Sequence, residues 1–462
     1  MSLLRRKLID ENPHRDTGLH RVLGALDLTL LGIGAVIGAG VFVLTGVAAA
    51  TQAGPAVVLS FVVAGAACAF SALAYAELAA MVGGAGSAYG YAYAGLGELI
   101  AWLIGWDLVL EYTVAVSAVA VGWSGYAANG LAALGIHLPS ALLRSPLEGG
   151  VINLPAVSII VILGTLLAWG VRGSARFNAV IVAVKLVAIA IFLAVAYGHI
   201  SSANWSPFMP FGWSGVMHGA ALIFFAYIGF DAVSTAAEEA RKPQRDLPIG
   251  IIASLVVCTF IYMLVALFLT GIAPYPTLNV PSPVADALLN VGVKWAAGVV
   301  AAGAIAGLTS VMLVLYYGQT RIFFAMSRDG LLPPVFSELH PVRRTPIKVI
   351  VVCGLVMTVI AGLVPLNEIA ELVNIGTLAA FTVVCVGVVI LRIRYPQRER
   401  PFRTPFSPLV PALGVISCLY LMANLPLITW LRFVIWMVIG LAIYFLYSRH
   451  HSLLEGKEES EA

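Results

Sequence analysis

Long apolar stretches follow one another along almost the whole chain, separated by short connectors rich in proline, glycine and charged residues. A hydrocarbon core about 30 Å thick requires about 20 apolar residues for one helical crossing. On that criterion the pattern predicts an all-α integral membrane protein with twelve transmembrane helices and no separate soluble domain. The predicted spans are residues 25–52, 55–80, 97–126, 151–171, 177–198, 213–239, 247–272, 293–325, 347–364, 369–392, 408–427 and 431–448.

Composition supports the same conclusion. The chain has 462 residues, of which 60% are hydrophobic and only 11% are charged, whereas soluble domains contain about 25% charged residues. The five cysteines all lie inside apolar stretches, so they are expected to be packing residues and not a disulfide framework. The eight histidines show no metal-ligand spacing, and no motif of a membrane-embedded enzyme is present in the sequence. We therefore expect no catalytic residues, no metal and no cofactor.

The positions of basic residues predict the orientation. Of the 26 lysines and arginines, 22 lie in the two ends of the chain and in the connectors on their side of the membrane, and three (Arg144, Lys294 and Arg432) lie on the opposite side. Basic residues accumulate on the cytoplasmic side of membrane proteins. We therefore expect a multi-pass protein of the cell membrane with both termini in the cytoplasm.

The first span contains an unusual run of glycines at mid-membrane. Gly32, Gly34, Gly38 and Gly40 fall within nine residues, and glycine destabilises a helix by about 1 kcal/mol relative to alanine. The spacing is not that of a nucleotide-binding loop, and no strand precedes it. Two interpretations remain: a small-xxx-small packing face at Gly34 and Gly38, or an interruption of the helix that lines a cavity.

A similar feature in the sixth span favours the interruption. Gly229 and Asp231 lie at mid-depth in the segment 224–231, and spans one and six cross the membrane in opposite directions. Interrupted helices at matching positions are typical of inverted-repeat transporters. We therefore predict a repeat of residues 25–198 (spans one to five) and 199–392 (spans six to ten). An N-terminal segment 1–24, two further spans in 393–450 and a C-terminal tail 451–462 complete the division.

Interrupted helices expose backbone groups that suit a zwitterion. Carbonyls at the end of the inner half of span one would lie beside N–H groups at the start of its outer half, and carbonyls of span six would face the same point. An α-amino acid, with its ammonium next to its carboxylate, fits this arrangement better than a sugar or a bare cation. The predicted substrate-binding residues are Val36, Ile37, Gly38, Ala39, Gly40, Val41, Phe225, Ala226, Ile228 and Met312.

Ionisable residues at membrane depth are functional candidates. Lys185 lies about 13 Å into span five at about 1.5 Å per residue, where burial disfavours its charged form; it is a candidate proton carrier, or else one half of a fixed ion pair. Asp107 and Glu111 share one face of span three. Glu111 could attract a cationic substrate, pair with Lys185 or stay protonated, and Asp231 could cap the inner half of span six or pair with Lys185.

Several segments in a fixed order resemble a known family. They are residues 38–42, Gly54-Pro55-Ala56, Tyr75-Ala76-Glu77, Gly86-Ser87-Ala88-Tyr89, the segment 238–248 and the segment 327–333. Over residues 18–450 the chain resembles the amino acid–polyamine–organocation (APC) superfamily, and most closely its cationic amino acid transporter branch. The resemblance implies the five-plus-five inverted-repeat fold (APC or LeuT-like), with discontinuous helices 1 and 6 and alternating access around one central site.

The resemblance also implies roles for particular residues. The substrate carboxylate would bind the amides of residues 39–41 and the amine the carbonyls of Val36 or Ile37 and of span six, with Phe225 as an aromatic lid. Lys185 falls where proton-coupled relatives place an ammonium instead of sodium, which implies proton-coupled, sodium-independent symport. Exchange on the same fold stays open, whereas an ion channel is disfavoured because no filter-like repeat is present.

The substrate range stays open at this stage. The branch implies arginine, lysine or ornithine, and Glu111 would agree with a cationic substrate, but Met312 in span eight favours small or neutral side chains. We therefore expect L-amino acids broadly. The expected partners are the substrate and the lipid bilayer, with no nucleic acid; a monomer is possible, and an accessory membrane subunit or a bound lipid stays open.

Overall fold

The computed structural model describes residues 23–82, 87–133, 135–170, 175–341, 343 and 345–454, and within these ranges the chain is helical without named strands. The all-helical prediction is therefore confirmed. The α-helices are α1 (Ala25–Val36), α2 (Thr45–Ala48), α3 (Val57–Val82), α4 (Ser87–Gly95), α5 (Glu98–Ala133), α6 (Leu154–Trp169), α7 (Ala175–Tyr197), α8 (Gly212–Ile223), α9 (Ala232–Thr235), α10 (Pro243–Ile272), α11 (Pro283–Asn290), α12 (Lys294–Arg328), α13 (Ile347–Leu363), α14 (Leu366–Arg394), α15 (Leu409–Ala423), α16 (Leu427–Ile443) and α17 (Arg449–His451).

Eight helical segments of the described chain are long and apolar enough to cross a membrane. Four shorter apolar helices, α1, α6, α13 and α15, accompany them. One of the eight, Gly40–Val82, runs through the outer half of the predicted first span and the whole second span, although Gly54 within it has a φ of +64°. The number of spans, the repeat boundaries and the orientation stay predictions, and the terminal segments 1–24 and 451–462 lie mostly outside the described residues.

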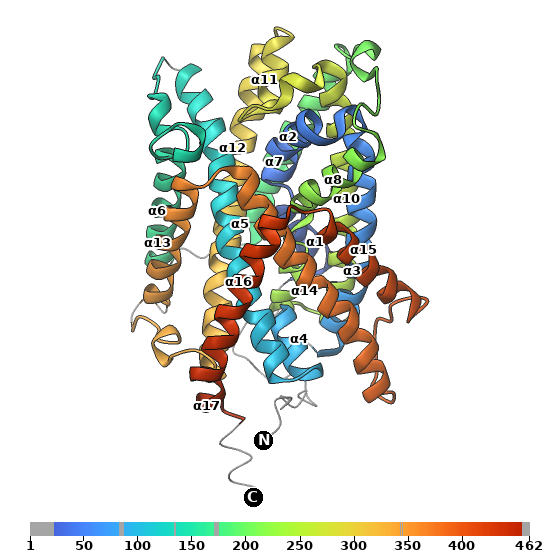
Figure 1. Ribbon diagram of the computed structural model, residues 1–462, viewed down its shortest axis with the longest axis vertical. Helices are drawn as coiled ribbons and strands as arrows, with labels where there is room; N and C mark the ends of the chain where they lie inside the picture. The colour runs from blue at the N-terminus through green and yellow to red at the C-terminus, as the bar shows by residue number, and fades with distance from the viewer. Residues whose placement is uncertain are drawn as a thin grey trace, which may run out of the picture.

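The helices run side by side along the long axis of the molecule, as Figure 1 shows. Helix α5 packs against α12 and α14, while α10 packs against α1 and α3. Helices α4 and α17 lie at one end of the molecule and α11 lies at the other (Figure 1). The short helix α1 is thereby enclosed by longer helices, which places the glycine run of the first span inside the bundle.

Tryptophan and glycine join the late helix α16 to α5. The rings of Trp106 and Trp436 stack with centroids 4.4 Å apart, and the indole N–H of Trp102 donates to the carbonyl of Gly440 at 2.8 Å. A Cβ at Gly440 would lie 2.3 Å from Trp106. Small residues let membrane helices approach closely where no hydrophobic effect drives them together, so α16 is held by shape and indole hydrogen bonds.

Candidate functional site

The first span is interrupted as the glycine run predicts. Helix α1 ends at Val36, Ile37 is extended with φ −74° and ψ 98°, and a π-helical segment resumes at Gly40. The N–H of Phe42 donates to the carbonyl of Gly38 at 3.3 Å. The first N–H groups of a helix have no acceptor within it, so the amides of residues 39–41 are available to a ligand.

The sixth span is also interrupted. Helix α8 ends at Ile223, a 3₁₀ turn covers Phe224–Tyr227, and Ile228 is extended before helix α9 begins at Ala232. Gly229 has a φ of +113°, a conformation that L side chains rarely adopt. The glycine is therefore required by the backbone at this point, and the predicted interruption of span six is confirmed.

The two interruptions touch each other. A Cβ at Gly40 would lie 2.3 Å from Cα and Cβ of Ala226, and a Cβ at Gly229 would lie 3.0 Å from the carbonyl oxygen of Ala35. Gly32 packs as tightly, because its Cβ would lie 2.5 Å from Oγ of Ser254 on α10. Both interpretations of the glycine run therefore hold. Some of the glycines permit close helix packing, and the run as a whole coincides with the interruption of the helix.

Lys185 of α7 reaches the end of α1. Its side chain is completely buried, and its ammonium donates to the carbonyls of Gly34 at 2.6 Å and Ile37 at 2.9 Å. The last carbonyls of a helix lack intrahelical donors and lie at the negative end of its dipole. Among the described residues Lys185 makes no ion pair, so the alternative of a fixed pair with a carboxylate is not observed.

Three buried carboxyl groups, those of Asp107, Glu111 and Asp231, lie near one another, and Asp231 belongs to the interruption of span six. Glu111 interacts electrostatically with Asp231 and Asp107, and the hydroxyl of Tyr112 donates to Oδ2 of Asp231 at 3.4 Å. Both carboxyl oxygens of Asp107 and Oε2 of Glu111 are buried without a hydrogen-bond partner among the described residues. Asp231 occupies the N-cap position of α9, but its side chain makes no capping bond. Pairing of Glu111 or Asp231 with Lys185, one of the alternatives that the sequence left open, is not observed in the described chain.

Tyr262 of α10 joins the two interruptions, and the sequence analysis missed it. Its buried hydroxyl lies 2.8 Å from the carbonyl oxygen of Val36 and 2.9 Å from that of Ala226. A phenol has one proton and donates to one of the two carbonyls at a time. A tyrosine in the middle of an otherwise apolar span was the available signal, because a buried hydroxyl normally requires a partner.

Asn374 of α14 was missed as well. Its side-chain amide donates to the carbonyls of Ala221 at 2.7 Å and Leu222 at 2.9 Å. These carbonyls lie in the last turn of α8, where intrahelical donors are lost. Asn374 therefore stabilises the end of the outer half of span six, much as Lys185 does for α1.

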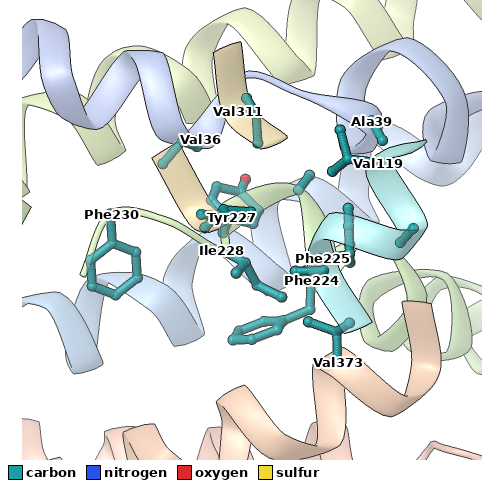
Figure 2. Close-up of a cluster of buried hydrophobic side chains, with 14 of the residues drawn as sticks. Val36, Ala39, Val119, Phe224, Phe225, Tyr227, Ile228, Phe230, Val311 and Val373 are labelled. Atoms are coloured by element: carbon teal, nitrogen blue, oxygen red, sulfur yellow. The ribbon is translucent and has the colours of Figure 1, made fainter. Parts of the chain in front are cut away.

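Apolar side chains surround the interruptions. Figure 2 shows Val119 of α5, Val311 of α12 and Val373 of α14 gathered with side chains of both interrupted spans. Phe225 is 5% exposed, and Val311 contacts the backbone beside Gly38, where a Cβ would lie 3.3 Å from it. Met312, the neighbour of Val311, is completely buried on the same helix. The site thus combines the backbone groups of two helix interruptions, some of whose carbonyls already accept bonds from Lys185 and Tyr262, with apolar walls.

Glu77 near the end of α3 is part of a different charge cluster. Its carboxylate is 1% exposed and accepts two hydrogen bonds from Arg392, at 2.8 and 2.6 Å, and one from the N–H of Thr404 at 2.7 Å. Arg400 lies 3.4 Å away. The cluster ties α3, α14 and the segment after α14 together through the buried carboxylate of Glu77.

Comparison with known proteins gives consistent results. A family model described as amino acid permease matches residues 23–448. The methylthioribose transporter of Bacillus subtilis (strain 168) is 51% identical over 457 residues, which are 98% of this chain and 99% of that protein. The branched-chain amino acid permease BcaP of the same strain is 50% identical over 461 residues, with the same coverage.

A plant relative belongs to the branch that the sequence resembles. The vacuolar cationic amino acid transporter 4 of Arabidopsis thaliana is 39% identical over 407 residues, which are 85% of this chain and 67% of that protein. These matches confirm the resemblance to transporters. They indicate that the chain is a transporter rather than an enzyme. From these matches and its apolar helices, the chain belongs to the amino acid permease family and is a bacterial, multi-pass membrane member of the APC superfamily.

Proposed function

We propose that this protein moves L-amino acids across the cytoplasmic membrane by alternating access around the two interrupted helices. The observation that carries this proposal is the contact of the two interruptions at Gly40 and Ala226. The proposal includes twelve spans, an inverted repeat of residues 25–198 and 199–392, and cytoplasmic termini. Substrate sites in such transporters lie at the interface of the repeats near mid-membrane.

The backbone groups of the interruptions are proposed to hold the zwitterion. The amides of Ala39, Gly40 and Val41 would receive the carboxylate at the positive end of a helix. The ammonium would bind carbonyls of Ala226 and Ile228, since a carbonyl oxygen has two lone pairs and the bond to Tyr262 occupies one of them at most.

The side-chain end of the site favours apolar substrates. Val119 lies near Ala39 in Figure 2, and it stands one turn before Gly122 on α5, where an added Cβ would lie 3.4 Å from Ala39. Glu111 lies eight positions before Val119, a distance of about 12 Å along the helix. A lysine or arginine side chain ending among Val119, Val311 and Phe225 would have no counter-charge there. We therefore propose branched or small apolar L-amino acids ahead of cationic ones, in keeping with the name of the BcaP relative.

Methylthioribose is the alternative substrate, because a relative of nearly equal identity is named for it. A neutral sugar thioether could occupy apolar walls but carries neither an ammonium nor a carboxylate for the exposed backbone groups. Competition against labelled isoleucine distinguishes the two: excess leucine should abolish uptake, whereas excess methylthioribose should leave it unchanged.

Proton coupling is proposed to depend on Lys185. The ammonium stabilises the end of α1 through two carbonyls, so loss of its proton would remove the charge that strengthens both hydrogen bonds and loosen one half of an interrupted helix. A residue that is charged in one conformation and neutral in another couples proton movement to the change. Because a side-chain cation already occupies this position, we propose that transport does not require sodium.

The test is uptake of isoleucine into proteoliposomes. An inward proton gradient should accelerate uptake, and replacement of sodium by potassium should have no effect. Uptake that ignores the gradient but requires amino acid inside the vesicles would show an exchanger. Current without saturation by substrate would show a channel, and no uptake of any amino acid would contradict the proposal.

A further inference from the structure

A groove on the outer surface of the bundle has no role in the proposed transport site. It encloses about 720 Å³ between the first four turns of α10 and the segment after α14. Its walls are apolar: Pro248, Ile249 and Val256 lie on α10, and Pro401 and Phe402 lie opposite. Val256 is 62% exposed, so the groove is open to whatever surrounds the protein.

The wall formed by Pro401 and Phe402 is held in place from behind. Arg400, the preceding residue, forms an ion pair with Glu77 at 3.4 Å. Thr404 donates its N–H to Glu77 at 2.7 Å and its hydroxyl to the carbonyl of Leu73 at 2.9 Å. Residues 401–402 are therefore held in place at both ends, because Arg400 and Thr404 are both bound to the buried carboxylate of Glu77.

One end of the groove is basic. Gln244 and Arg245 line it at the start of α10, and both are exposed. In the described part of the chain, Arg245 forms no ion pair. Helix α10 begins at Pro243, so the positive end of its dipole lies at the same end of the groove.

The length of the groove matches one leaflet of a bilayer. From Arg245 to Val257 helix α10 rises about 18 Å, and half of the hydrocarbon core is about 15 Å thick. An occupant with an anionic head and an apolar tail as long as one leaflet satisfies both ends. A free anion would use only the basic end, and a zwitterionic lipid would bring its own cation to Arg245.

We propose that this groove is a binding site for one anionic phospholipid, with its phosphate at Arg245 and the N-terminus of α10 and an acyl chain along Ile249 and Val256. Under the orientation predicted from the basic residues, the lipid belongs to the inner leaflet. The opposite side of α10 packs against α1, because a Cβ at Gly250 would lie 2.8 Å from Leu28. The lipid would thus lie behind the helix that supports the inner half of span one.

The experiment measures lipid binding by the full-length protein and not transport, so its outcome is independent of the proposed substrate. Purified protein in detergent is titrated with phosphatidylglycerol or phosphatidylcholine, and bound lipid is counted by native mass spectrometry. Arg245→Ala should weaken phosphatidylglycerol binding about fivefold, the factor expected from one basic side chain beside an anionic lipid. Ile252→Trp, which fills the groove, should weaken it at least as much.

A matched control and two opposing outcomes complete the design. Arg449→Ala removes a basic residue of α17, away from the groove, and should bind phosphatidylglycerol as the unchanged protein does. Equal losses in Arg245→Ala and Arg449→Ala would overturn the site in favour of general charge attraction. Unchanged binding in both groove variants, or displacement of the lipid by equimolar inorganic phosphate, would overturn it too.

Discussion

Lys185 and Glu77 are both buried charges, yet the protein surrounds them differently. Glu77 has two arginines and a backbone N–H around its carboxylate. Lys185 has only two carbonyls, and the buried carboxyl groups of Asp107 and Glu111 keep oxygens without partners among the described residues. A buried group that is paired with opposite charges keeps its charge, because neutralising it would leave its partners unpaired. A buried group that is balanced only by backbone dipoles can change its protonation state at a lower free-energy cost. The difference separates a charge that is paired near a helix end from buried charges without counter-charges, one of which we propose to carry protons.

The largest expected effect concerns the fixed charge. Glu77→Ala leaves Arg392 and the buried Arg400 without their carboxylate, and breaking such a pair costs about 3–5 kcal/mol. The free energy of unfolding in detergent, measured with denaturant, should fall by that amount. A loss well below it would show that Glu77 is no more fixed than Lys185 and would remove the distinction between the two regions.

The second effect concerns the charge of Lys185, which has no counter-charge in the described chain. Lys185→Ala leaves the carbonyls of Gly34 and Ile37 without donors, each at a cost of about 1–3 kcal/mol. Gradient-driven isoleucine uptake should fall about 100-fold, the equivalent of about 2.7 kcal/mol. Lys348→Ala is the matched control, because that lysine is exposed and paired with Glu338; its uptake should match the unchanged protein.

A second variant at Lys185 distinguishes the effect of its positive charge from the effect of its ability to release a proton. Lys185→Arg keeps a cation near the two carbonyls, but arginine does not lose its proton in proteins. Gradient-driven uptake should be lost while exchange of internal for external isoleucine persists. Gradient-driven uptake at the normal rate in this variant would mean that Lys185 supports the helix end and carries no proton.

The sequence was informative at residues that a continuous apolar helix tolerates poorly. Glycines in the middle of a span predicted both interruptions, and Gly229 at φ +113° is the clearest case. A lysine within an apolar run was equally specific, although the sequence left its partner open and the described structure places carbonyls there. Pattern alone reveals that a buried charge needs balancing but not which atoms balance it.

The missed residues show why the remainder could not be predicted. Tyr262 and Asn374 lie far along the chain from the carbonyls that they contact, at separations of 226 residues for Val36 and 153 for Ala221. Tyrosines and asparagines also occur in membrane helices for packing. Which of them meets a helix end depends on how α10 and α14 pack, which the apolar pattern leaves free.

Tyr262 supplies the third prediction, which refines the contrast at mid-membrane. Tyr262→Phe removes the single donor that serves the carbonyls of Val36 and Ala226. An unsatisfied buried acceptor costs about 1–3 kcal/mol, so isoleucine uptake should fall about tenfold with the proton dependence intact. A loss of proton dependence would instead place Tyr262 beside Lys185 in the coupling machinery. Tyr420→Phe, at a tyrosine that is 52% exposed on α15, is the control.

The smallest effect calibrates the whole series. Glu368 and Arg432 form a short ion pair of 2.6 Å, but their side chains are 35% and 38% exposed. Water screens such a pair, and exposed ion pairs contribute about 0–1 kcal/mol. Glu368→Ala should therefore change the free energy of unfolding by less than about 1 kcal/mol, although its distance equals the shortest contact of Glu77. If Glu368→Ala lowered the free energy of unfolding as much as Glu77→Ala does, the distance between the charges and not their burial would determine the strength of an ion pair. The contrast between Glu77 and Lys185 would then need another cause.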